Sequence, residues 1–228
     1  MWYEPIFEDR SHAGRVLAGY LKEFANKDDV VILALPRGGV PVGYEVARAL
    51  KAPLDVFVVR KLGVPGQEEL AFGAVATGGV TVFNQGILQV LRMPEEIRDT
   101  VIRKEEAELD RREKLFREGR QPIDPRDKTV IVVDDGLATG ATMAAAVEAL
   151  RKMGSKKIIV AVPVASKRAC DDLDAIANVK AICAETPEPF YGVGIWYQNF
   201  SQTTDEEVQE LLAKRNESVN SRSKAHSS

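Results

Sequence analysis

A run of β-branched residues, 130–133 (Val-Ile-Val-Val), leads directly into two adjacent acids, Asp134 and Asp135. An unbroken apolar run of this length predicts a strand that is buried on both faces, as in a parallel sheet. Ligands of open parallel sheets bind beyond the carboxyl ends of the strands. We therefore expect the two acids to lie in a ligand site.

The turn that follows, residues 136–142, contains only small side chains apart from Leu137, and a helix is predicted from about Met143 to Met153. Backbone N–H groups at such a turn, together with the positive end of a helix, favour a phosphate. A strand end followed by a plain turn is the structural alternative. Two acids, two glycines and two threonines in one short segment favour the ligand site instead.

These residues resemble the phosphoribosyl diphosphate (PRPP) motif of the type I phosphoribosyltransferases. The resemblance extends over about residues 30–200. It implies that Asp134 and Asp135 bind the ribose 2- and 3-hydroxyls. It also implies a 5-phosphate loop formed by Ala138, Thr139, Gly140, Ala141 and Thr142.

A second anion loop is expected after the first predicted strand, residues 30–35. Its residues are Pro36, Arg37, Gly38 and Gly39. Two glycines let backbone amides approach a ligand, and Arg37 offers a fork of donors to phosphate oxygens. By itself the segment could be an ordinary turn. The family resemblance implies a diphosphate-binding loop with a cis peptide bond between Pro36 and Arg37.

Arg60 and Lys61 are expected at the end of a second strand, residues 54–59. They resemble the pair that precedes the mobile loop of adenine and orotate phosphoribosyltransferases, which makes residues 62–71 a candidate lid; an ordinary surface loop is the alternative. Ala138 stands where hypoxanthine-type enzymes carry an acid. The proton acceptor must then come from elsewhere, and Glu68 and Glu69 are candidates.

Aromatic residues concentrate in residues 185–200 of a chain that is otherwise poor in them. This segment resembles the hood of hypoxanthine-type enzymes, in which an aromatic ring stacks on the base. Phe190 is the best match and Tyr191 the second, while Trp196 replaces the expected hood acid. The structural alternative is that these rings seal the sheet edge.

Alternating strands and helices predict an α/β fold, with a parallel β-sheet covered by helices on both faces. We expect one phosphoribosyltransferase-like domain over residues 1–215, with a core of about 26–184 and a small hood from 1–25 and 185–215. Ser11 is expected to cap a helix over 12–24, and residues 72–76 and 80–83 to form a hairpin. The polar residues 216–228 predict a disordered tail.

Two further patterns concern the rest of the chain. Residues 95–118 predict a long charged helix, for which a solvated face is the first interpretation and a homodimer contact is left open. Cys170 and Cys183 lack metal or redox spacing, so two reduced thiols are expected.

Composition excludes several function classes. The formal net charge is −3 among 228 residues, which argues against a nucleic-acid partner. No apolar run reaches membrane-spanning length and no signal peptide is evident, so a cytoplasmic location is expected. With only His12 and His226, a Ser-His pair or a His-rich metal site is disfavoured. No P-loop or dinucleotide-binding glycine pattern is found.

The resemblance therefore implies a glycosyltransferase of nucleotide metabolism that uses PRPP and magnesium, transfers the phosphoribosyl group to a nitrogenous base and releases diphosphate. Asp134 and Asp135 would orient the ribose, with magnesium bridging substrate oxygens near them. Arg37, Arg60 and Lys61 would offset the diphosphate charge. The alternatives are a PRPP-binding regulatory protein without catalysis and a different phosphate-ester binder.

Overall fold

The computed structural model of the protein describes residues 4–225, except for the side chains of residues 68–69 and 218–225. Its core is a parallel sheet of five strands in the order β2-β1-β6-β7-β8. These strands are β1 (Val30–Ala34), β2 (Leu54–Val56), β6 (Thr129–Val133), β7 (Lys157–Val164) and β8 (Val179–Glu185). The predicted α/β class is confirmed.

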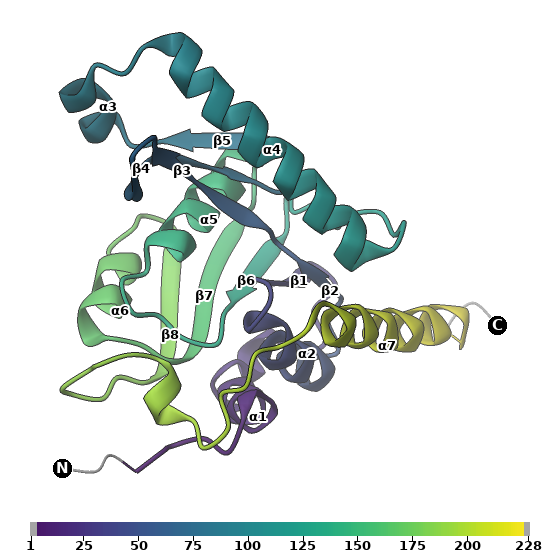
Figure 1. The fold of residues 1–228 in the computed structure, drawn as a ribbon. Helices are drawn as coiled ribbons and strands as arrows, with labels where there is room; N and C mark the ends of the chain where they lie inside the picture. The colour runs from purple at the N-terminus through teal and green to yellow at the C-terminus, as the bar shows by residue number, and fades with distance from the viewer. Residues whose placement is uncertain (1–3, 226–228) are drawn as a thin grey trace.

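Helices cover both faces of this sheet (Figure 1). Side chains of β6 alternate between the faces, so Val130 and Val132 pack in the cluster that holds α5 and α6, while Ile131 and Val133 pack in the cluster that holds α2. Burial on both faces is why the strand is an unbroken apolar run. The bounds are α1 (Arg10–Tyr20), α2 (Gly39–Leu50), α5 (Ala141–Lys152) and α6 (Lys167–Asp174). Asp9, rather than Ser11, caps α1 through its side chain.

A smaller antiparallel sheet follows β2, with strands β3 (Val59–Val64), β4 (Gln67–Ala76) and β5 (Val80–Phe83). The predicted hairpin over 72–76 and 80–83 is confirmed. The single strand expected over 54–59 is wrong. Phe57 still belongs to the main sheet, because its N–H donates to the carbonyl of Ala34. The next residue, Val58, already contacts the second sheet, because its N–H donates to Thr77 Oγ1.

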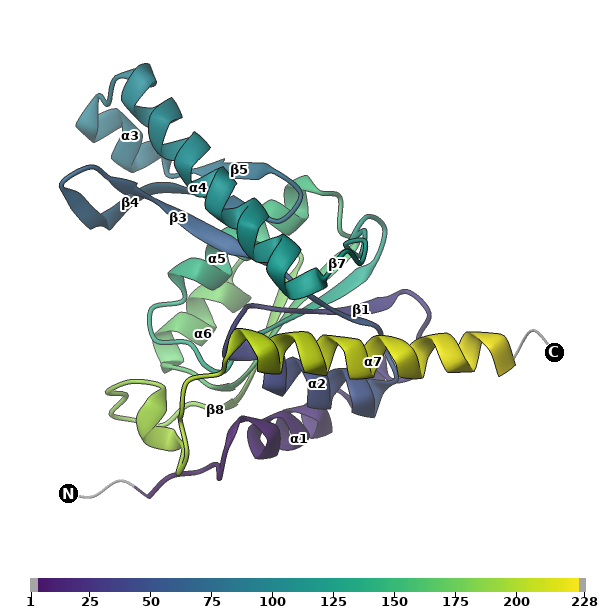
Figure 2. The same ribbon diagram turned by 45° about the vertical axis from the view of Figure 1, so that its right-hand side comes forward.

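Helix α4 (Glu95–Arg117) lies along the smaller sheet, after the short helix α3 (Gln85–Leu91) (Figure 2). Its last residue, Arg117, donates from Nε to both carboxylate oxygens of Asp55, at 3.0 and 3.1 Å, and from Nη2 to the carbonyl of Val56. The side chains of Arg117 and Asp55 are only 6% and 8% exposed. This buried pair fixes the end of α4 to the end of β2.

The last described element is helix α7 (Asp205–Ala225), which lies beside α2 and α4 (Figures 1 and 2). Val208 and Leu212 are buried in the core, and Arg215 Nε donates to the carbonyl of Ala52 at 2.9 Å. The structure thus differs from the disordered tail expected after residue 215, because the helix continues through Ala225; residues 226–228 lie outside the described residues. The short 3-10 helices are Lys22–Phe24 and Gly194–Trp196.

The expectation of two reduced thiols is wrong, because Cys170 and Cys183 form a disulfide. Helix α6 connects β7 to β8 and packs on β8, which places the two Cα atoms 6.5 Å apart. The pairing depends on how α6 returns to the sheet, so the spacing in the sequence carried no signal for it. Among residues 4–225, none of the helices combines the length and apolar character that crossing a bilayer would need.

The Asp55→Ala substitution should lower the free energy of unfolding by about 3 kcal/mol, because the buried Arg117 guanidinium loses the carboxylate that accepts from its Nε and keeps the pair with Glu113. Lys167→Ala removes an exposed pair with Asp171, which solvent screens, and should cost much less. Urea denaturation of both variants and the parent at pH 7 measures the difference. Equal losses in the two variants would contradict the anchoring role of this pair.

Candidate active site

The acid pair lies where the sequence predicted it, at the carboxyl end of β6. The neighbouring strand β1 ends at the same edge, and Leu35 N–H donates to the carbonyl of Val133 at 2.8 Å. The loop Pro36–Gly39 is therefore pressed against the two acids. A Cβ on Gly39 would come within 2.7 Å of the Val133 carbonyl oxygen and 2.9 Å of Asp134 Cα, so this approach requires glycine. The Pro36–Arg37 peptide bond is cis, as expected.

The two carboxyl groups have unequal surroundings. Asp134 Oδ1 accepts the backbone N–H of Asp135 at 2.8 Å. Burial raises the pKa of the Asp134 carboxyl well above its usual value, and the neighbouring charge of Asp135 adds to the effect. Burial also raises the pKa of Asp135, but the Arg10 guanidinium acts in the opposite direction. The pair therefore holds charge at a high free-energy cost, which a ligand with hydroxyl donors could reduce.

Arg10, which the sequence analysis did not single out, is the main partner of Asp135. Its Nε donates to Asp135 Oδ2 at 2.8 Å, and its Nη1 donates to the carbonyl of Ser201 at 2.6 Å. The guanidinium also stacks over the ring of Phe200, 4.0 Å from the centroid. One residue of α1 thus joins the acid pair to the C-terminal part of the hood. The contact spans 125 positions, so no local pattern could reveal it.

Tyr197 adds a second contact between the hood and the acid pair. Its hydroxyl donates to the Asp135 carbonyl at 2.6 Å, and Phe7 pairs with Tyr197 in an isolated bridge. Burial is the largest cause that raises the pKa of this phenol, so the hydroxyl stays a donor. The N- and C-terminal segments therefore meet beside the acids, as the predicted hood requires.

The predicted phosphate loop connects the acid pair to α5. Gly140 takes a φ of +73° immediately before the first turn of α5, a conformation that favours glycine. Ser166 Oγ supports the loop from behind by donating to the Ala138 carbonyl at 2.8 Å. The side chains of Ala138, Thr139 and Ala141 are exposed. The first-turn N–H groups of a helix lack intrahelical acceptors, so this end of α5 can receive an oxyanion.

Residues 7–186 match the family model described as the phosphoribosyl transferase domain. This chain belongs to the phosphoribosyltransferase family. It is 46% identical, over 207 residues, to a Mycobacterium tuberculosis protein whose name provisionally assigns it to the phosphoribosyl transferases. That match covers 91% of this chain and 46% of the relative, so the chain spans about half the length of this relative.

Two further proteins are similar to this chain. The crystal structure of TT1426 from Thermus thermophilus is 39% identical, with a TM-score of 0.80; the match covers 91% of this chain and 98% of that one. The bifunctional protein PyrR of Deinococcus radiodurans is 28% identical over 127 residues, which cover 54% of this chain and 68% of the relative. The resemblance inferred from the acid-pair loop is thus confirmed at the level of the family.

In this phosphoribosyltransferase domain, Arg60 and Lys61 lie within β3 and not at the end of a main-sheet strand, which corrects their expected place. Arg60 donates to Glu105 Oε2 at 2.6 and 2.9 Å. Both basic residues line a cavity of about 500 Å³ that also includes Thr142 of the phosphate loop and Lys104 of α4. The structure therefore brings three sequence-predicted residues together, Arg60, Lys61 and Thr142.

The candidate lid, residues 62–71, is a paired hairpin between β3 and β4 and not an irregular loop. Whether it closes over the site stays a prediction. The side chains of Glu68 and Glu69, the candidate proton acceptors, lie outside the described residues.

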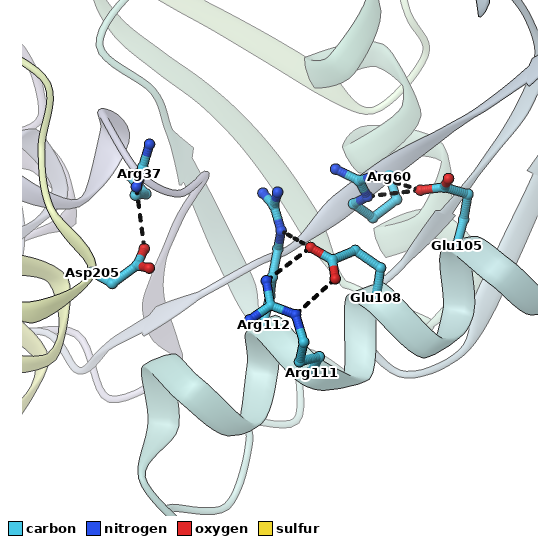
Figure 3. A network of polar contacts seen from close by, with 7 residues as sticks. All are labelled: Arg37, Arg60, Glu105, Glu108, Arg111, Arg112 and Asp205. Atoms are coloured by element: carbon cyan, nitrogen blue, oxygen red, sulfur yellow. Dashed lines mark hydrogen bonds and ion pairs between the residues drawn. The ribbon is translucent and has the colours of Figure 1, made fainter.

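Arg37 extends from the loop Pro36–Gly39 toward α4 and α7. Its Nη1 lies 3.4 Å from Asp205 Oδ1 (Figure 3). It lines a second cavity of about 200 Å³ with Arg111, Arg112, Leu115, Phe116 and Asp205. Residues of α4 line both cavities, which also include Thr142 from the turn after β6 and Arg37 from the turn after β1.

The hood aromatics are placed differently from one another. Phe190 packs against the small cluster that includes Phe7 and Trp196, whereas Tyr191 is 69% exposed. Neither ring lines the two cavities described above. Stacking of a base on Phe190 or Tyr191 therefore stays a prediction. The contacts of Phe190 within this cluster fit the structural alternative, in which the ring packs in the hood.

The Gly38→Ala substitution should destabilise the protein by about 1–3 kcal/mol, because the new Cβ would overlap Asp135 Oδ2 and approach Arg10 Nε at 3.2 Å. Gly19→Ala in α1 is the matched control: nothing lies within 4 Å of its new Cβ, and it should stabilise the helix by about 0.5–1 kcal/mol. Urea denaturation gives both values. Equal stability of the two variants would show that a Cβ at position 38 does not clash with Asp135.

The Asp134→Asn variant should be more stable than the parent, increasingly so as pH rises from 4 to 8. A carboxyl whose pKa is raised by folding binds a proton more readily in the folded protein, so ionisation above pH of about 4 costs the parent stability. The amide removes that cost and keeps an acceptor for the Asp135 N–H. Asp172→Asn, at an exposed site of α6, should show no such trend. A constant difference between pH 4 and pH 8 for Asp134→Asn would contradict this account.

Proposed function

We propose that this chain transfers the phosphoribosyl group of PRPP to a nitrogenous base, a purine or a pyrimidine, and releases diphosphate. The meeting of two loops at one sheet edge carries the proposal. The acid pair follows β6 and the glycine loop follows β1, in direct contact. Acids suit a diol, the amides before α5 suit a phosphate, and Arg37 suits a diphosphate. These are three groups of one substrate.

The phosphate loop would hold the 5-phosphate through its amides and the hydroxyls of Thr139 and Thr142. Asp134 and Asp135 would accept hydrogen bonds from the ribose 2- and 3-hydroxyls. Arg10 occupies one oxygen of Asp135, but a carboxylate has about four acceptor positions, so the ion pair and a ribose hydroxyl can share the group. Arg10 would thus orient Asp135 for the sugar.

In the reaction, the bond from C1 of the ribose to the diphosphate oxygen breaks, a bond from C1 to a ring nitrogen forms, and that nitrogen loses its proton. The acid pair would stabilise positive charge that develops at C1. Arg37, Arg60 and Lys61 would stabilise the diphosphate as it leaves. Holding the reactants in line would supply much of the acceleration.

Asp134 and Asp135 could hold magnesium, directly or through ribose hydroxyls or water, and the ion would supply positive charge near the leaving group. Two carboxylates at the edge of the site suit such an ion as hard oxygen donors. Within the described residues no group of three or more His, Cys, Asp or Glu could hold a metal by itself.

A second function, PRPP-dependent regulation without transfer, is favoured by one observation. The two predicted base-stacking rings are placed apart from both cavities, with Tyr191 exposed and Phe190 packed in the hood. A protein that only senses PRPP needs the phosphate and ribose contacts and no platform for a base.

The test is diphosphate release from PRPP and magnesium with a panel of purine and pyrimidine bases. We expect release with at least one base, and a loss of about 10- to 100-fold in kcat/KM for Asp135→Asn, as for a hydrogen bond to a charged group worth about 1.5–3 kcal/mol. Asp172→Asn is the matched exposed control. PRPP binding without release for any base would favour the regulatory function, and absence of PRPP binding would refute both.

A further inference from the structure

The long helix α4 carries basic residues whose role the proposed function does not explain. Lys104 lines the larger cavity, and Arg111 and Arg112, about two turns further along, line the smaller one. Arg98, by contrast, pairs with Glu95 on the surface of the same helix. Basic residues of α4 thus present positive charge to both cavities.

The smaller cavity has an excess of positive charge. Among its lining residues are three guanidinium groups, from Arg37, Arg111 and Arg112, and one carboxylate, from Asp205. In the view of Figure 3 the guanidinium of Arg112 reaches into the space between Arg37 and Arg60. Guanidinium groups converging on one cavity favour a multiply charged oxyanion, to which each can donate two hydrogen bonds.

Glu108 holds the two α4 arginines in this arrangement. It accepts from Arg111 at 2.7 and 3.0 Å and from Arg112 at 2.8 Å. The hydrogen bonds from Arg111 and then from Arg112 lower the pKa of the Glu108 carboxyl to about 2. Its charge is therefore present at neutral pH, and its two oxygens accept from Nε and Nη2 of Arg111 and from Nε of Arg112, three donors that phosphate oxygens could otherwise use.

We propose that Arg111 and Arg112 of α4 complete the diphosphate site with Arg37, and that Glu108 holds their guanidinium groups until the diphosphate displaces it. The inference rests on the proposed assignment of the loop Pro36–Gly39 to the diphosphate end of the substrate. Under this proposal α4 is part of the binding site, and its arginines bind ligand in addition to forming ion pairs along the helix.

The experiment measures the affinity of the full chain for inorganic diphosphate by isothermal titration calorimetry, with magnesium present, and for ribose 5-phosphate in parallel. Arg112→Ala should weaken diphosphate binding about 10-fold or more, and Arg111→Ala should weaken it in the same direction. Glu108→Gln should strengthen it several-fold, because a competing carboxylate is removed. Binding of ribose 5-phosphate should stay within about 2-fold in all three variants.

Two substitutions on the same helix serve as matched controls. Arg103→Ala removes an exposed guanidinium that contacts only the Thr100 hydroxyl among its recorded partners, and Glu95→Gln removes the carboxylate of the surface pair with Arg98. Both should leave the diphosphate affinity within about 2-fold. Circular dichroism of each variant confirms that α4 is intact.

The outcomes separate the inference from the proposed function. Diphosphate binding that depends on Arg112, in a protein that never turns over PRPP, supports the inference and removes the transferase proposal. Turnover of PRPP with unchanged diphosphate affinity in Arg112→Ala removes the inference alone. Equal losses for diphosphate and ribose 5-phosphate, or no diphosphate binding by the parent, also overturn the inference.

Discussion

The contact between the ends of β1 and β6 is the constraint on which the site depends. The two strands pair in register over their full length, so the loops that follow them begin side by side at the same edge of the sheet. Gly39 then lies against Val133 and Asp134, and Gly38 against Asp135, with no room for a side chain at either position. Any residue with a Cβ would push the anion loop away from the acids. The glycines therefore set the separation between the two ends of the proposed substrate site.

Charge buried near this edge is compensated from distant parts of the chain. Arg10 of α1 stabilises Asp135, and Arg117 of α4 stabilises Asp55 at the end of the neighbouring strand β2. A buried ion pair contributes little net stability, but loss of one partner is costly. Such pairs thus restrict the positions of α1 and α4. They add little to the overall stability of the fold. The same helices carry the side chains that border the site, so their placement determines its shape.

The sequence predicted the features that depend on local pattern. Residues 130–133 indicated a buried strand because both faces are covered, and the acid-pair turn carried the family resemblance that the comparisons confirm. What it did not predict depends on tertiary contacts. The Arg10–Asp135 pair joins residues 125 positions apart, the Cys170–Cys183 disulfide depends on the return of α6, and α7 persists beyond residue 215 although its composition suggested disorder. Arg60 and Lys61 also lie elsewhere than predicted, because tertiary contacts lead the chain out of the main sheet after β2 and into β3 of the smaller sheet.

The arginines around the proposed diphosphate site are each paired with a carboxylate: Arg60 with Glu105, Arg112 with Glu108 and Arg37 with Asp205. An entering anion therefore competes with carboxylates that already accept from these guanidinium groups. A singly charged anion would gain little from that exchange, because it offers the same charge as the carboxylate it displaces. A diphosphate brings several charges and more acceptor oxygens at once, so its gain grows with each arginine that it engages. Internal carboxylates of this kind would make the site selective for polyvalent ligands, which connects the charge pattern of α4 to the chemistry proposed at the end of β6.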